Sequence, residues 1–341
     1  MALILAGDIG GTSTRLACFK AVDGRLRRGV SKKYPSRNYG GLVEIVRLFV
    51  KEHQVPIACA AFGIAGPVRN ARVVTPNLAW IVERSELVRA LGLDSLWLLN
   101  DLEANAYGLP MLGSEDFASI NAGVVDPQGN VAVISAGTGL GEAGALWDGH
   151  RHRPFAGEGG HADFSPRSEL EAELLQYLRK RVGHVSWERV VSGPGLCGIY
   201  EFLRDTARGV EQPWVRERMR DRVSAAVISD AALEGRCELC TRALGLFVSL
   251  YAAEAGNFAL KILATAGVYL GGGIAPKILG KLRTPEFMES FSDKGRMRDL
   301  LETIPVKVIL NEETALLGAA RFAALGAGLP DPGARPARVQ G

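Results

Sequence analysis

Short apolar runs alternate with amphipathic stretches along the chain, and this alternation predicts strands that are followed by helices. The predicted strands occupy residues 3–7, 14–19, 24–34, 57–68, 96–100, 131–147, 151–164, 267–271 and 306–310. The predicted helices occupy residues 40–53, 85–92, 101–108, 168–183, most of 215–265, and 311–325. Ser85 is the expected cap of the second helix, and Ser168 with Glu171 forms the expected capping box of the fourth.

Two glycine turns, Gly7-Asp-x-Gly-Gly11 and Gly137-Thr-x-x-Gly141, each lie in a strand meander that leads into alternating helices and strands. This repetition predicts a duplicated α/β unit with the ligand between its halves. A length of 341 residues also fits two domains. We expect a small domain over residues 1–110 plus about 302–326, and a large domain over 111–301. The proline-containing tail, 327–341, is expected to be disordered.

Charge and hydropathy argue against nucleic-acid and membrane partners. The net charge is only +3, and basic and acidic residues are interspersed along most of the chain. The longest apolar region, 244–275, is broken by charged residues and a glycine triplet, so it predicts a buried helix followed by a buried strand. The apolar N-terminus is too short for a signal sequence. Five cysteines, an odd number, fit a reducing cytoplasm.

Three glycine turns, "AGDIGGTSTR", "SAGTGLGEAG" and "LGGGIAP", each follow an apolar strand. Glycine lets backbone N–H groups approach an anion closely, so the three turns together favour a polyphosphate site. The chain has no P-loop motif. Gly139-Leu-Gly-Glu-Ala-Gly144 matches the dinucleotide fingerprint, but that fingerprint requires a helix directly after it. The segment that follows, "ALWDGHR", predicts a hairpin instead.

Acidic side chains lie beside two of the predicted strands. Asp8 is expected at the tip of the first glycine turn, where a carboxylate tolerates phosphate only with a divalent cation such as Mg²⁺ between them. Asn100 and Asp101 end an apolar strand. Asp101 caps the next helix in the simpler interpretation. In the functional one it accepts a proton from an alcohol that attacks phosphorus, while Asn100 holds a neighbouring hydroxyl.

A further polar group includes Glu158 and His161 in "AGEGGHADF" and Glu188 before another glycine-rich turn. A polyhydroxylated ligand needs such groups because each hydroxyl both donates and accepts hydrogen bonds. The structural alternatives are a pair between His161 and Asp163 and a first-turn position for Glu188. A zinc site at Glu158, His161 and Asp163, or at Cys237 and Cys240, lacks further ligands in the sequence.

These segments resemble the bacterial glucokinase family, within the hexokinase, actin and heat-shock-chaperone ATPase fold group. The resemblance extends from Leu3 to about Leu325. It is carried, in family order, by "GDIGGTSTRL", "GPV…TPNLAW", "LLNDLEANAYGLP", "SAGTGLG", "GEGGHADFSP", "GHVSWERVVSGPGL", "GGGIAPK" and "FSDKGR". Two departures stand out: Ser13 replaces a frequent asparagine, and the cysteine-rich motif of related sugar kinases and repressors is absent, so no structural zinc is expected.

The resemblance implies an α/β, two-domain actin-like ATPase (ribonuclease H-like) fold with mixed sheets and a cleft between the domains. It implies ATP- and Mg²⁺-dependent phosphorylation of D-glucose to glucose 6-phosphate, which feeds glycolysis, by a cytoplasmic homodimer. Asp101 matches the catalytic base, and the sugar-binding positions are Asn77, Asn100, Asp101, Glu158, His161 and Glu188. The ATP-binding positions are Gly7, Asp8, Ile9, Gly10, Gly11, Thr12, Gly137, Thr138, Gly139, Gly272 and Gly273, with Asp8 also assigned to Mg²⁺.

Three other functions remain open at this point. One is a kinase for another hexose. A second is a nicotinamide-dependent oxidoreductase, which predicts a helix that begins near Gly144. The third is a non-catalytic sugar sensor or an actin-like ATPase, which predicts no sugar-dependent turnover.

Overall fold

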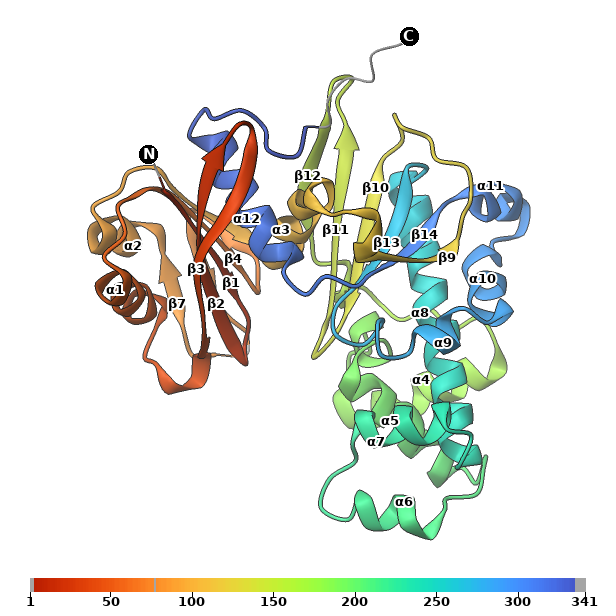
Figure 1. Ribbon diagram of the computed structural model, residues 1–341. Helices are drawn as coiled ribbons and strands as arrows, with labels where there is room; N and C mark the ends of the chain where they lie inside the picture. The colour runs from red at the N-terminus through yellow and green to blue at the C-terminus, as the bar shows by residue number, and fades with distance from the viewer. Residues whose placement is uncertain (1–2, 77, 335–341) are drawn as a thin grey trace. The chain divides into compact units, whose positions relative to one another are not determined.

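A computed structural model of the protein describes residues 3–76 and 78–334 (Figure 1). Contacts among its elements divide the chain into two α/β units. The first unit spans Met1–Asp116, Pro154–Ala156 and Asn311–Gly341, and the second spans Phe117–Arg153 and Gly157–Leu310. A large sheet with both parallel and antiparallel strands forms the centre of each unit, as the sequence predicts.

The large sheet of the first unit has five strands in the order β3-β2-β1-β4-β8, and a small sheet has the order β5-β6-β7. The strands are β1 (Leu3–Ile9), β2 (Ser13–Val22), β3 (Arg25–Pro35), β4 (Ile57–Ile64), β5 (Val68–Arg69), β6 (Arg72–Val74), β7 (Ile81–Glu83) and β8 (Leu96–Asn100). The helices are α1 (Leu42–His53), α2 (Arg84–Leu91), α3 (Asp101–Gly108) and α12 (Thr314–Gly326). Because β1, β4 and β8 run parallel, their carboxyl ends meet at one edge.

Helices cover both faces of this sheet because its strands are apolar on both sides. On one face, Leu5 and Ile9 of β1 belong to the same buried cluster as Ile45 of α1. On the other face, Ile4 of β1 clusters with Leu316 of α12. Successive side chains of a strand point to opposite faces, so the uninterrupted apolar run in β1 requires both layers.

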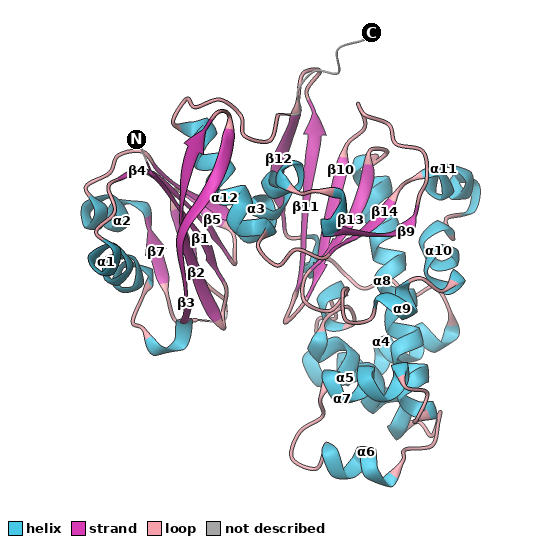
Figure 2. Cartoon of the chain, viewed as in Figure 1, coloured by secondary structure: helices cyan, strands magenta, loops and turns pink. Residues whose placement is uncertain are grey.

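The sheet of the second unit has six strands in the order β12-β11-β10-β13-β14-β9 (Figure 2). The strands are β9 (Phe117–Asn121), β10 (Val131–Ala136), β11 (Leu140–Trp147), β12 (His152–Gly157), β13 (Gly267–Gly271) and β14 (Val306–Ile309). The helices are α4 (Glu169–Val182), α5 (Gly193–Asp205), α6 (Pro213–Arg218), α7 (Ala225–Leu233), α8 (Glu238–Ile262), α9 (Leu279–Leu282), α10 (Pro285–Ser292) and α11 (Arg298–Thr303).

The two large sheets repeat one strand pattern. An antiparallel hairpin, β1–β2 or β10–β11, pairs through its first strand with one parallel strand, β4 or β13, and that strand pairs with a second parallel strand, β8 or β14. The added β9 lies antiparallel to β14. The duplicated α/β unit suggested by the two glycine turns is therefore present in the topology.

Helix α8 is the core helix of the second unit. By length and composition it is apolar enough to cross a membrane, but 72% of its most apolar stretch is buried inside the protein. Its side chains belong to one buried cluster with those of α5, α7 and α10. The prediction of a buried helix followed by a buried strand at 244–275 is confirmed.

The units differ from the expected domain boundaries. The sequence boundary near 302 assigns β14 to the small domain, whereas β14 pairs with β13 and β9 in the sheet of the second unit. The described part of the tail, 327–334, is held by a bidentate ion pair between Arg321 and Asp331. The described residues 327–334 thus contact α12, whereas the sequence predicts disorder there, and residues 335–341 lie outside the described residues.

Two capping predictions need correction. Helix α2 begins at Arg84, with Glu83 at the N-cap and no side-chain cap, so Ser85 lies inside the helix. Ser168 does cap α4 by accepting from Glu171 N, at 3.3 Å. The Glu171 carboxylate accepts instead from Arg167 N and pairs with the Arg167 side chain, so the reciprocal half of the capping box is replaced by an ion pair.

Candidate active site

Asn100 and Asp101 lie at the carboxyl edge of the first sheet, where β8 passes directly into α3. Asn100 is the N-cap: its Oδ1 accepts from Leu102 N at 2.9 Å and Glu103 N at 3.2 Å. Asp101 is the first helical residue, and its Oδ1 accepts from Leu102 N at 3.0 Å. The interpretation of Asp101 as the N-cap is therefore wrong, because the preceding amide takes that position.

The Asn100 amide has little hydrogen-bonding capacity left. Its Oδ1 already accepts two N–H groups, and its Nδ2 donates to Gly66 O at 3.2 Å. The residue is 4% exposed. An amide nitrogen has two hydrogens, so Asn100 can offer a ligand one further donor. Its main structural effect is to fix the start of α3, and with it the position of Asp101.

Glycines allow α3 to pack closely on its neighbours. A side chain at Gly318 of α12 would collide with Ala104 O, and one at Gly108 would collide with Thr314 O. A methyl group at Gly63 of β4 would lie 2.8 Å from the Ala104 Cβ. Helix α3 is thus held on two sides, which keeps the partly exposed Asp101 at a defined place on the sheet edge.

The first glycine turn, Gly10–Thr12, follows β1 at the same edge, because Ile9, Ile64 and Asn100 are aligned across the three parallel strands. The turn is held by buried Ser36, whose Oγ donates to Gly10 O at 2.9 Å. Ser36 was not singled out from the sequence, since a lone serine after a strand carries no signal of such a contact.

Asp8, Gly7 and Ile9 lie within β1 and pair with β2 and β4 on both sides. Asp8 is therefore not at the tip of the turn, as the sequence suggested, but in the strand before it. Although the residue is partly exposed, desolvation of its carboxyl group raises the pKa to about 6, against the lowering effects of Arg15 and Lys33. In the turn that follows, Gly10 N donates to Ser13 O at 3.0 Å, which closes the hairpin.

In the second unit, two glycine turns meet at the carboxyl edge of the sheet. Strands β10 and β13 are parallel, and Ser135 is aligned with Gly271, so the turns at 137–139 and 272–273 are neighbours. Ile274 N donates to Ala136 O at 3.3 Å. Gly272 has φ of 80°, and a side chain there would collide with Ala136 O. Exposed Thr138 lies at the tip of the first of these turns.

The dinucleotide fingerprint leads into a strand. Strand β11 begins at Leu140 and continues to Trp147, in antiparallel pairing with β10. The helix that would place its N-terminus at a pyrophosphate is thus replaced by a hairpin, as the sequence predicted. This geometry contradicts the nicotinamide-dependent oxidoreductase.

Glu158, His161 and Glu188 come together in the second unit. Their segments lie side by side, since Trp187 N donates to Ala162 O at 3.0 Å. His161 Nε2 lies 3.9 Å from Glu158 Oε2. Desolvation raises the pKa of Glu158, His161 opposes the rise, and the charge of Glu188 adds to it. The exposed Glu158 and His161 and the partly exposed Glu188 are close enough together to share the hydroxyl groups of one ligand.

Glu188 is fixed by two hydrogen bonds. Its Oε2 accepts from Leu140 N at 3.0 Å, which ties it to the start of β11. Its backbone carbonyl accepts from Ser192 Oγ at 2.7 Å, and Ser192 also caps α5. The expected pair between His161 and Asp163 does not form, because Asp163 Oδ1 lies 2.8 Å from Nε2 of His184.

Asn77 lies outside the described residues. Within 3–76 and 78–334, no group of three or more histidine, cysteine, aspartate and glutamate side chains is arranged to hold a metal ion.

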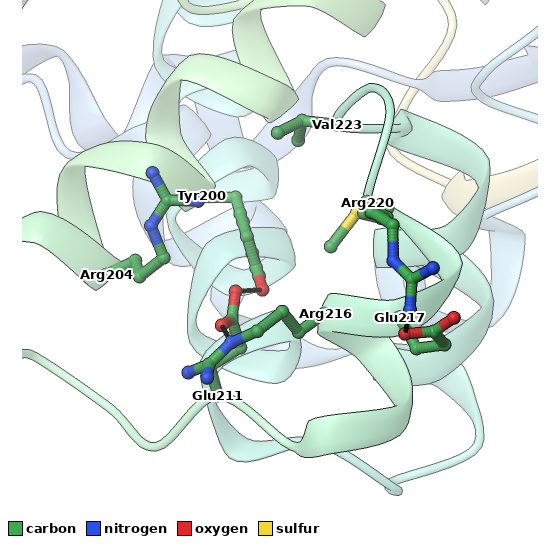
Figure 3. Close-up of a pocket in the computed structure, with 8 residues that line it drawn as sticks. Tyr200, Arg204, Glu211, Arg216, Glu217, Arg220 and Val223 are labelled. Atoms are coloured by element: carbon green, nitrogen blue, oxygen red, sulfur yellow. Dashed lines mark hydrogen bonds and ion pairs between the residues drawn. The ribbon is translucent and has the colours of Figure 1, made fainter.

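A cavity of about 620 Å³ lies among α5, α6 and the segments around them in the second unit (Figure 3). Its wall carries Arg204, Arg216 and Arg220. Glu211 accepts from Tyr200 Oη at 2.6 Å and from Arg216 Nε at 2.6 Å, and Glu217 pairs with Arg220. Arg204 pairs with Asp205 at 2.9 Å, so each of the three arginines has an acidic partner. The cavity contains none of the predicted site residues.

Comparisons with known proteins agree with the geometry. The family model described as "Glucokinase" matches residues 5–325. A glucokinase from Synechocystis sp. is 44% identical over 345 residues, covering 94% of this chain and 97% of that protein. The crystal structure of a glucokinase from an Antarctic psychrotroph superposes with a TM-score of 0.82 at 32% identity, covering 96% of this chain and 99% of that one.

A more distant structure shares the fold. The ROK family glucokinase from Streptomyces griseus, in complex with glucose and AMPPNP, has a TM-score of 0.65 at 21% identity, covering 95% of this chain and all of that one. The match of the family model over nearly the whole chain, and the 44% identity, carry the assignment. The chain belongs to the glucokinase family of ATP-dependent hexose phosphotransferases.

Proposed function

We propose that this protein transfers the γ-phosphoryl group of Mg·ATP to the 6-hydroxyl of D-glucose, giving glucose 6-phosphate and ADP. The observation that carries the proposal is the placement of Asp101. It is a partly exposed carboxylate at the first turn of α3, fixed by the buried Asn100 cap at the edge where the β1–β2 glycine turn also lies.

Asp101 is the proposed catalytic base. Its carboxylate accepts the proton of the 6-hydroxyl as that oxygen forms a bond to the γ-phosphorus, and the bond between the γ-phosphorus and the β-phosphate oxygen breaks to release ADP. Positioning and charge neutralisation supply most of the catalysis in such transfers. General-base assistance contributes roughly 10²–10⁴-fold.

Sugar binding is assigned to Glu158, His161 and Glu188. Asn100 is assigned one hydrogen bond to the sugar, donated by its side-chain amide. The support for the first three residues is that they lie close to one another in the second unit. The support for Asn100 is that its other hydrogen-bonding positions are already occupied, which leaves one N–H for a ligand. Asn77 keeps its proposed sugar contact, although it lies outside the described residues.

Phosphate binding is assigned to the three glycine turns, in which Thr12 and Thr138 are exposed hydroxyl residues. When bound, a Mg²⁺ ion would neutralise part of the charge of the phosphates. Asp8 fits this ion, because a desolvated carboxylate with a raised pKa gains from a nearby cation.

The experiment that tests the function measures ADP release with and without glucose, and with mannose and fructose in its place. We expect release that depends on glucose, and NMR identification of the phosphate at O6. A non-catalytic sensor gives no sugar-dependent release, an actin-like ATPase releases ADP without sugar, and faster release with another hexose reassigns the substrate.

Gly272→Ala is expected to raise the KM for ATP about tenfold or more. The alanine side chain would meet Ala136 O at a φ of 80°, a strain of about 1–3 kcal/mol that displaces the turn. Gly273→Ala is the matched control, since no atom lies within 4 Å of its added methyl group. Steady-state kinetics at saturating glucose provide the comparison, and equal ATP KM values in the two variants would remove Gly272 from the nucleotide site.

The apparent affinity for Mg²⁺ is expected to weaken by about tenfold per pH unit below pH 6. The pKa of Asp8 is raised to about 6, so the carboxylate is present above that pH and is lost by protonation below it. Initial rates are measured against Mg²⁺ concentration from pH 5 to 7.5 in the wild type and in Asp8→Asn. Titration of the ATP phosphates affects both proteins, so only the difference reports on Asp8. Identical pH profiles would contradict its assignment.

We also propose a homodimer in the cytoplasm, which the family resemblance implied. The five cysteines are free thiols, as in proteins of reducing compartments. Light scattering on the purified protein should give twice the 36.5-kDa chain mass, and a single-chain mass would contradict the dimer.

A further inference from the structure

The loop that carries Glu158 and His161 rests on the first residues of β11. A methyl group at Gly157 would lie 3.2 Å from Glu142 O, and one at Gly160 would collide with Leu140 O. A methyl group at Gly159 would collide with the Glu142 carboxylate at Oε2. The loop is therefore in close contact with β11, and its middle glycine lies against the Glu142 side chain.

Glu142 is a buried carboxyl group in the second unit. It is 1% exposed, and its Oε1 has no hydrogen-bond partner among the described residues. Its direct neighbour is Glu254 of α8, which is fully buried. Glu254 Oε2 accepts from Asn257 Nδ2 at 2.8 Å, and its Oε1 lies 3.5 Å from Lys261 Nζ. Lys261 thus lies close to Glu254 and also acts electrostatically on Glu142.

The charged surroundings favour a proton on this pair. Desolvation raises the pKa of Glu142 to about 8, Glu254 adds to the rise, and Lys261 opposes it. The pKa of Glu254 is also raised by desolvation. Tyr251 of α8 also faces Glu142, and Lys294 faces Glu254 from the segment after α10. Two adjacent buried carboxylates repel each other, so the pKa of one of them rises strongly and a proton on the pair is favoured.

We propose that Glu142 and Glu254 form a proton-sharing carboxyl pair that positions the Gly157–His161 loop for hexose binding. The inference rests on the proposed function, in which Glu158 and His161 contact the sugar. While the pair holds its proton, Glu142 lies under Gly159 without a net charge. When the proton is lost, the two carboxylates repel each other, and Gly159 leaves Glu142 no room to move without displacing the loop.

The test compares the KM for glucose and kcat from pH 6 to 9.5 in wild type, Glu142→Gln and Glu254→Gln. In the wild type the KM should rise about tenfold between pH 7 and 9, because ionisation near pH 8 removes the binding-competent form. Glu142→Gln keeps the shape of the neutral acid and should hold the KM flat. Glu254→Gln removes the repulsion and should also flatten the profile. The kcat profiles should coincide.

Glu238→Gln is the matched control, because Glu238 lies on α8 but is exposed and paired with Arg242. It should follow the wild type. If Glu142→Gln keeps the wild-type rise in KM, the pair does not position the loop. If the wild type shows no glucose-dependent ADP release, the proposed function itself fails, and that result is distinct from an unchanged pH profile with turnover intact.

Thermal unfolding supplies a second readout, which needs no substrate. The pKa of Glu142 is raised from 4.5 to about 8 in the folded state. Between these two pH values the unfolded chain releases the proton while the folded protein holds it, so the free energy of unfolding falls progressively as pH rises. The melting temperature of Glu142→Gln should therefore gain on that of the wild type as pH rises through this window. A constant difference across it would contradict the protonated pair.

Discussion

Replacement of Asp101 by asparagine is expected to lower glucose-dependent ADP release by about 10²–10⁴-fold, while glucose affinity stays within a few-fold of the wild type. The asparagine side chain keeps an oxygen that can accept from Leu102 N, so the start of α3 is preserved. What is lost is a carboxylate that can take the proton of the 6-hydroxyl. Single-turnover kinetics and calorimetric glucose titration separate the two effects.

Glu103→Gln is the matched control for Asp101→Asn. Both residues lie in the first turn of α3, where loss of a negative charge costs about 0.3–1 kcal/mol of helix stability. If the loss of activity reflects only a weakened helix, both variants lose it equally. We expect Glu103→Gln to turn over at nearly the wild-type rate. Normal turnover by Asp101→Asn would show that the carboxylate is not the base.

Glu188→Gln is expected to raise the KM for glucose by about 10- to 100-fold with a smaller change in kcat. A hydrogen bond to a charged group contributes about 1.5–3 kcal/mol, and the sugar loses such an acceptor. The glutamine carbonyl can still accept from Leu140 N, so the structural bond at the start of β11 remains. Steady-state kinetics at saturating ATP give the KM and kcat.

A series of deoxyglucoses tests which sugar hydroxyl Glu188 binds, because the substitution and the loss of that hydroxyl remove the same hydrogen bond. The analogue that lacks the hydroxyl bound by Glu188 should bind weakly to the wild type, but Glu188→Gln should add no further loss for that analogue. Every other deoxyglucose should show the full effect of the substitution. A uniform effect across the whole series would mean that Glu188 acts on the site only through its structural hydrogen bond.

Hydrophobic pattern predicted most elements because period and composition are local properties. The strand at 96–100 and the helix at 42–53 follow directly from apolar runs and spacing. Local pattern failed where partners lie far along the chain. The strand at 306–309 pairs with 117–121 and 267–271, and no local feature reports which unit it joins.

The site was predictable where polar residues interrupt apolar runs. Asn100 and Asp101 end a buried strand, so their position was visible, but which of them caps α3 depends on backbone dihedral angles that the sequence does not display. Glu142 was not singled out, although an acid between Gly141 and Ala143 in an apolar strand is unusual. Its importance comes from Glu254, more than a hundred residues later.

The most direct measurement is a crystal structure of the protein with glucose and a non-hydrolysable ATP analogue. If Asp101 is the base, one of its carboxylate oxygens lies within about 2.6–3.2 Å of the glucose 6-hydroxyl. A carboxylate that stays on Leu102 N, remote from every sugar oxygen, would contradict it.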